Sequence, residues 1–202
     1  TGSPAYGSGD SLGAGWPEHF PVEEVVPGVI RLTGAYPQRP TVGNQLVLRH
    51  YDRNCPAVFL KASKDALLQD VRIHHAGGMG VIGQFCENVT LRRCVVTPAA
   101  GRVFSTAVDA SHFVNCRGDI LLEDCLFEGQ LDDPCNVHGI YSRIKEVGDG
   151  RSLITELVHP EQHGVDIAFP GDRLGLSDHD TLLSYSNHVV ESVEPIDERF
   201  CR

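Results

Sequence analysis

Three stretches of this chain share one pattern and decide its fold: ALLQDVRIHH at 66–75, VTLRRCVVTP at 89–98 and ILLEDCLFEG at 120–129. Each reads Leu, any residue, polar, Val or Cys, any residue, apolar. Apolar residues at alternating positions are typical of strands with one buried face. A 23-residue step and then a 31-residue step align three rows: Leu68, Leu91 and Leu122; Val71, Cys94 and Cys125; and Ile73, Val96 and Phe127.

A repeat of this length predicts a parallel β-helix, because it is too short for two helices and consists of β-branched strands separated by turn residues. Each coil would bury its apolar rows against the next coil. The 31-residue step holds eight more residues than the 23-residue step, and TPAAGRVFSTA at 97–107 is the place for them. We expect a protruding loop there, and such surface loops often form binding walls.

The flanking regions differ from the repeat in composition. Residues 1–20 are rich in Gly, Ser and Pro, which indicates a flexible lead-in. The segment 21–147 is predicted to hold the β-helix, beginning with strand-and-turn runs such as VVPGVIRL at 25–32. From 148 to 202 the repeat is lost but strand-like runs continue, so we expect a small β-barrel or hairpin unit. The predicted fold class is all-β.

Composition excludes several classes of partner and cofactor. The chain has 202 residues and a formal net charge of -10, without a basic run, which argues against nucleic acid and anionic membrane as partners. No apolar run reaches the ~20 residues that span a bilayer. The seven cysteines show no zinc-binding spacing, so we expect no structural metal. They fit either a disulfide framework or buried small apolar side chains.

Two aspartate sites are the candidate catalytic feature. Asp109 lies in VDASHF, and the 23-residue step leads from it to Asp132, which with Asp133 lies in QLDDPCNVHG. If one coil takes this step, the carboxylates stack on neighbouring coils, roughly 4.8 Å apart. Crowded carboxylates can supply both the proton donor and the ionised base that hydrolysis of a glycosidic bond needs. A calcium site or a solvent-facing acidic ridge explains the same spacing.

Four polar residues near strand ends are candidates for binding a sugar: His74 and His75, followed by AGGMG, and Asn136 and His138 in NVHG. Their side chains can hydrogen-bond sugar hydroxyls. The glycines after His75 would allow close approach of a ligand to the backbone. Corners of a solenoid also need Gly and Asn, so a purely structural role remains open.

Several separate motifs together resemble glycoside hydrolase family 110, the α-1,3-galactosidases. They occur in the order that the family shows, closely over about 42–145 and more loosely in the tail. The motifs are VGNQLVLRHYDRNCPAVFL at 42–60, KDALLQDVRIHHAGGMGVIGQ at 64–84, GRVFSTAVDASHFVNCRG at 101–118 and FEGQLDDPCNVHGIY at 127–141.

The resemblance implies a right-handed parallel β-helix with β-barrel insertions and no metal cofactor. It implies removal of terminal α-1,3-linked galactose from glycans with inversion. For the location we expect an extracellular or periplasmic setting. Asp132 would be the general acid, and Asp109 and Asp133 would hold the attacking water. Pro134 and Cys135 depart from the family pattern and place a fixed φ and a thiol beside the acid pair.

Two other functions fit the same residues. The chain could be a non-catalytic β-helix module that binds galactose-containing glycans, or that forms a homo-oligomer through its exposed coil ends. A calcium-dependent polysaccharide lyase would need a base beside the acidic cluster, and Arg102 and Arg117 are the nearby candidates.

Overall fold

The computed structural model describes residues 21–33, 41–45, 47, 55–159 and 162–202, so the predicted lead-in at 1–20 lies outside the described residues. The described residues form strands, turns and loops without an α-helix, which agrees with the all-β prediction. Among them, no helix has the length and apolar character needed to cross a membrane. The chain divides into two compact units, residues 1–138 and 139–202.

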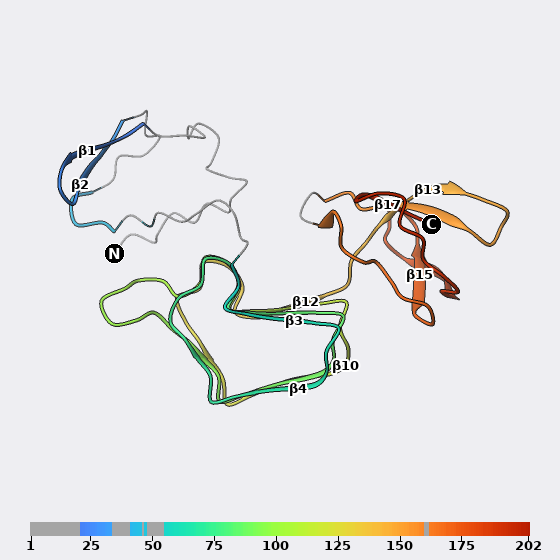
Figure 1. Ribbon diagram of the computed structural model, residues 1–202, viewed down its shortest axis with the longest axis horizontal. Helices are drawn as coiled ribbons and strands as arrows, with labels where there is room; N and C mark the ends of the chain where they lie inside the picture. Colours follow the sequence, from blue (N-terminus) through green and yellow to red (C-terminus); the bar gives the residue numbers. More distant parts are fainter. Residues whose placement is uncertain (1–20, 34–40, 46, 48–54, 160–161) are drawn as a thin grey trace. The chain divides into compact units, whose positions relative to one another are not determined.

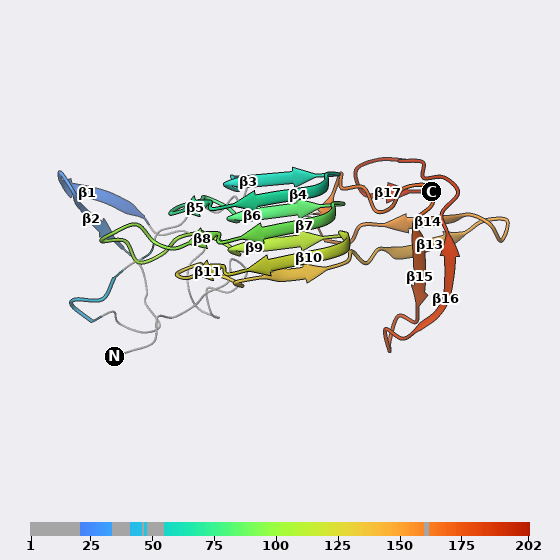
Figure 2. The ribbon, with the colours of Figure 1, turned by 90° about the horizontal axis from the view of Figure 1, so that it is seen from below.

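Most of the first unit consists of coils that visit three parallel sheets in turn (Figures 1 and 2). The sheet orders are β12-β9-β6-β3, β10-β7-β4 and β11-β8-β5. Coil 1 comprises β3 (Val58–Lys61), β4 (Lys64–Gln69) and β5 (Arg72–Ile73), and coil 2 comprises β6 (Val81–Gln84), β7 (Glu87–Arg92) and β8 (Val95–Val96). Coil 3 comprises β9 (Ser111–Val114), β10 (Arg117–Glu123) and β11 (Leu126–Phe127), and β12 (Asn136–His138) follows it.

The strand register confirms the alignment made from the sequence. Leu91 pairs with Leu68 on one side and with Leu122 on the other. Val96 likewise pairs with Ile73 and with Phe127. The three coils therefore stack in the predicted register.

Residues with a positive φ recur at three fixed positions of each coil. These positions are where the chain leaves the first strand, where it begins the second strand and where it leaves the second strand, with φ between 47° and 67°. The columns are Ala62, Phe85 and Asn115; Asp65, Asn88 and Gly118; and Asp70, Arg93 and Asp124. A residue in the left-handed region bends the chain sharply. Because such residues recur at equivalent positions, successive coils turn at the same places.

Coil 2 forms the centre of the core because it has a neighbouring coil on each side. Leu91 and Cys86 are fully buried, and Val89 and Val96 are each 1% exposed. All seven cysteines are described, and all are free thiols. Burial raises the pKa of the Cys94 thiol, which bonds to the backbone oxygen of Leu68. This supports the interpretation of the inward cysteines as small apolar side chains.

The eight extra residues of coil 3 are divided between two places. A 23-residue step from Ala76 would lead to Ala99, but Ala76 forms its bridge with Thr106. Seven of the extra residues therefore belong to the loop after β8, which protrudes in Figure 1. The eighth lies in β10, where the register shifts between Arg117 and Ile120. Gly118 occupies this bulge with φ +67°, and a Cβ there would lie 2.1 Å from the side-chain oxygen of Asn88. The predicted loop is confirmed, and the bulge is an addition to it.

The run VVPGVIRL forms a hairpin, since β1 (Val22–Val26) pairs antiparallel with β2 (Val29–Leu32). Gly28 turns the chain with φ +80°. The predicted strand-and-turn texture is therefore present at this end of the first unit.

The second unit contains antiparallel sheets in the orders β13-β14-β17 and β15-β16. β13, which the sequence analysis included in the 21–147 region, pairs with β14 of this unit. Buried Glu156 joins the larger sheet through ion pairs with Lys145 at 3.3 Å and with Arg199. The strands are β13 (Arg143–Val147), β14 (Leu153–Glu156), β15 (Arg173–Ser177), β16 (Ser184–Val189) and β17 (Phe200–Cys201).

Candidate active site

The three aspartates lie where the chain enters neighbouring strands of one sheet. Asp109 precedes β9, and Asp132 and Asp133 precede β12. Because His112 pairs with Asn136, the residue stacked on Asp109 is Asp133. The 23-residue step predicted that Asp132 stacks on Asp109. This prediction is wrong by one residue. In the same register, Asp132 is the residue stacked on Val108.

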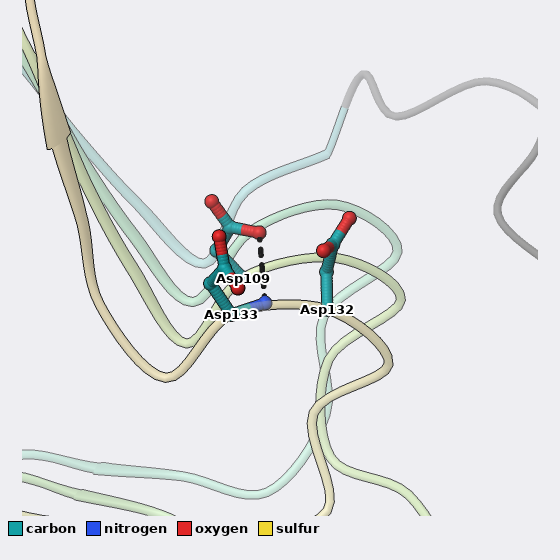
Figure 3. Close-up of side chains that lie close together, drawn as sticks. All are labelled: Asp109, Asp132 and Asp133. Atoms are coloured by element: carbon teal, nitrogen blue, oxygen red, sulfur yellow. Dashed lines mark hydrogen bonds between the residues drawn. The ribbon is translucent and has the colours of Figure 1, made fainter. Parts of the chain in front are cut away.

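The carboxylates converge on one side of the coils (Figure 3). One oxygen from each of the three side chains lies within 4.8 Å of the others. Asp109 is 3% exposed, whereas Asp132 and Asp133 are exposed. The backbone N–H of Asp133 donates to Oδ1 of Asp109 at 3.3 Å, so the buried carboxylate also ties the two coils together.

Asp109 lies on a buried bend that leads into β9. Ser105, Thr106 and Ala110 are fully buried in this bend. The Thr106 hydroxyl donates to the Val108 carbonyl at 2.7 Å. Gly80 lies against the bend from coil 2, and a Cβ on it would come within 2.4 Å of the Ala110 carbonyl oxygen. The neighbouring coil can approach this closely because Gly80 has no side chain. This agrees with the structural role for glycines at solenoid corners that the sequence analysis left open.

A histidine pair lies directly beside the buried aspartate. Nδ1 of His112 is 2.6 Å from Oδ2 of Asp109. Nε2 of His112 is 2.9 Å from Nε2 of His138, and the two rings meet edge to face. A chain of hydrogen bonds thus runs from His138 through His112 to Asp109.

The two departures from the family pattern do not block the carboxylates. The Pro134 carbonyl accepts hydrogen bonds from both the backbone N–H and the hydroxyl of Ser111. The Cys135 side chain packs against the hydrophobic core. Pro134 therefore fixes β12 to β9, and the thiol lies among apolar side chains.

The predicted sugar-binding residues fall into two groups. Asn136 and His138 lie on β12 beside His112, next to the aspartates. His74 lies at the corner after β5, where its Nδ1 is 3.0 Å from the Thr97 carbonyl. The His75 ring meets the Phe104 ring of the protruding loop at 5.4 Å. The described contacts of this second pair go to the loop rather than to the aspartates.

The arrangement has the groups required for acid–base chemistry. The cluster consists of a buried carboxylate, an exposed one stacked on it and a third beside them, and carboxyl groups can donate or accept protons according to their ionisation. The nearest oxygens are closer together than the roughly 6.5–9.5 Å of an inverting pair. Asp132 is exposed, so a change of rotamer alters its distance to the others. The same oxygens could also coordinate a hard cation such as calcium.

His112 is the site residue that sequence reasoning missed. Its sequence signal is the Asp-x-x-His spacing within VDASHF. In the observed register, His112 falls on Asn136 and within reach of His138. The predicted register, which is shorter by one residue, hid this neighbourhood.

Comparison with known proteins identifies the family of the chain. Residues 152–202 match the family model of the GLAA-B beta-barrel domain II. The chain is 42% identical to alpha-1,3-galactosidase A of Shewanella woodyi over 88% of this chain and 29% of that protein. It is 36% identical to alpha-1,3-galactosidase B of Phocaeicola vulgatus, over 88% and 30% of the two chains. Identity to alpha-1,3-galactosidase A of Bacteroides fragilis is 31%, over 87% and 29%.

The chain spans about three tenths of the length of these curated relatives. The similarity extends over both units, and the resemblance recognised from the motifs of the first unit is confirmed. The chain belongs to the α-1,3-galactosidase family.

Proposed function

We propose that this chain carries the catalytic region of a glycoside hydrolase that removes terminal α-1,3-linked galactose from glycans. The observation that supports this most is the convergence of Asp109, Asp132 and Asp133 in a chain of this family. In the proposed fold the coils form a right-handed parallel β-helix, with the second unit as a small β-barrel. The proposed setting is extracellular or periplasmic, where such glycans occur.

Asp132 is the proposed general acid. It is exposed at the end of the cluster, where its carboxyl can reach the glycosidic oxygen of a bound substrate. Protonation of that oxygen lets the acceptor sugar leave as the bond to the galactose C1 breaks.

Asp109 and Asp133 are proposed to hold the water that attacks C1 from the opposite face of the ring. One of them takes a proton from that water as the new bond forms, and the product is then β-galactose. Stacked on neighbouring coils, the two side chains can bind one water between them. Inversion rests on the family resemblance and is the step that a product measurement tests. His74, His75, Asn136 and His138 are the proposed contacts to sugar hydroxyls.

One assay tests the proposal. The purified chain is incubated with Galα1-3Gal, and free galactose is measured against the Asp109→Ala variant. Release by the wild-type chain alone is expected, and proton NMR of the first-formed sugar should show the β anomer. Initial α-galactose would overturn the inverting mechanism, and absence of release by the wild-type chain would overturn catalysis by this chain.

A second candidate function is a non-catalytic module that binds galactose-containing glycans or assembles through its coil ends. The supporting observation is the exposure of Leu121, Leu126 and Val137 on β10, β11 and β12, which are the last strands of their sheets. Binding of Galα1-3Gal without its cleavage, or a concentration-dependent dimer, would favour this function.

A further inference from the structure

His112 occupies the space behind the aspartate that the proposed mechanism uses as a base. Its side chain is 13% exposed and that of Asp109 is 4% exposed, so their hydrogen bond is largely shielded from water. The bond, at 2.6 Å, is the shorter of the two that the structure gives for the Asp109 carboxylate. Shielded hydrogen bonds to a charged group are among the strong ones.

The geometry assigns the proton positions of the pair. An ionised carboxylate can only accept hydrogen bonds, so the bond at Oδ2 requires the proton on Nδ1 of His112. Only one proton fits between the two Nε2 atoms, which are 2.9 Å apart. In neutral His112 the Nε2 atom is therefore the acceptor, and His138 donates to it. The contact with His138 thus selects the tautomer that His112 needs to donate to Asp109.

The two bonds to Asp109 fix its carboxylate in one orientation. His112 holds Oδ2 from the side of β9, and the backbone N–H of Asp133 holds Oδ1 from the neighbouring coil. Rotation about the Cβ–Cγ bond would break both. A base fixed in this way meets its water without first losing rotational freedom, and such preorganisation acts on the chemical step rather than on substrate binding.

We propose that His112, with its tautomer set by His138, is a positioning residue that holds Asp109 ready to accept a proton from the attacking water. This inference rests on the proposed function and deepens it, since it names a residue that acts through the base.

Kinetics of the full chain test the positioning role. His112→Phe keeps a ring of similar size but removes both nitrogens, and it should lower kcat on Galα1-3Gal at least about tenfold with KM nearly unchanged. His112→Asn keeps a donor near the position of Nδ1 and should recover most of the loss. The matched control is His179→Phe, which removes an exposed histidine bonded to Asp180 at 3.0 Å and should leave both constants unchanged. An unchanged kcat in His112→Phe, or a rise in KM alone, would overturn the proposal.

A second measurement separates this inference from the proposed function. Nitrogen-15 NMR of the imidazoles reports the tautomer whether or not the chain cleaves its substrate. The proton of His112 should reside on Nδ1 and exchange slowly with water, and Asp109→Ala should make that exchange fast. If the wild-type chain releases no galactose, the proposed function is wrong, but the tautomer of His112 can still be measured. A proton on Nε2 of His112 with none on Nδ1 would sink the positioning role even in an active enzyme.

Discussion

The leucine row inside the coils and the aspartate column at their corner use the same stacking geometry with opposite energetic consequences. Leu68, Leu91 and Leu122 lie in register on successive coils and exclude water from one another. Asp109 and Asp133 also lie in register, but stacking brings their like charges together. Like charges opposite each other on neighbouring strands are destabilising. The comparison indicates that the coils stabilise the fold through their inner rows and accept a loss of stability at the acidic corner.

The largest expected effect is on catalysis at this corner. Asp132→Asn removes the proposed proton donor while keeping the size of the side chain, and should lower galactose release from Galα1-3Gal by about 10²–10⁴-fold. Substrates with good leaving groups should lose much less, since they do not need protonation. The control is Asp119→Asn, an exposed aspartate in the β10 bulge. Equal losses on both substrate classes would contradict the assignment of Asp132 as the acid.

The inner row should show the next largest effect. Leu91→Ala leaves a cavity at a fully buried position and should lower the free energy of unfolding by about 2–5 kcal/mol. Leu121→Ala, on the adjacent strand but 47% exposed, should change it by about 0.5 kcal/mol or less. Urea unfolding followed by circular dichroism measures both variants. Similar losses at the two positions would mean that the row does not carry the stability of the coils.

Glu156 provides a carboxylate with the opposite surroundings. Burial alone would raise its pKa, but the bonds and charges of Lys145 and Arg199 outweigh this and hold the pKa below its usual value. The stability from these pairs is present above the unfolded pKa of about 4.3 and is lost as pH falls through the folded value. Glu156→Gln should therefore flatten the acid side of the stability profile in urea unfolding. Glu191→Gln, which alters an exposed pair with Arg151, should leave the profile unchanged.

A smaller effect of opposite sign is expected at the aspartate column. Asp133→Asn removes one of the stacked charges and should raise the free energy of unfolding by up to about 1 kcal/mol while abolishing most activity. Thermal unfolding and the galactose assay on the same preparation would show both changes. A variant that is less stable than the wild type would mean that Asp133 contributes more by its bonds than it costs by its charge.

No effect is expected from removal of divalent cations. Treatment with EDTA should leave galactose release unchanged, because the three carboxylates have acid–base roles in the proposed mechanism. Loss of activity that calcium restores would instead make the aspartate cluster a metal site and revive the lyase alternative.

The apolar rows could be predicted from the sequence because a buried position constrains residue type at every coil. The pairing at the corner could not be predicted, because residues separated by the 23-residue step do not occupy equivalent positions on neighbouring coils there. The loop after β8 and the one-residue bulge lengthen the step between coils by different amounts, depending on the strands compared. The bulge lies between Asp109 and Asp133 and adds one residue to that step, so Asp133 rather than Asp132 stacks on Asp109, and His112 meets His138.

The β13 strand shows another limit of sequence reasoning. Its alternation fits either unit, and only the pairing with β14 assigns it to the second unit. The sequence of a strand does not identify its partner when tertiary contacts determine the pairing.

The bulge at Gly118 has a consequence for how such a protein can vary. The extra residue is held by Asn88, whose side-chain oxygen accepts from the backbone N–H of Asp119, and the pairing downstream resumes unchanged at Leu126 with Val95. An insertion at this point is therefore absorbed within one strand and does not reach the corner that carries the aspartates. Changes of length in the loop after β8 can reshape the surroundings of the site, whereas changes in the bulge leave that corner as it is.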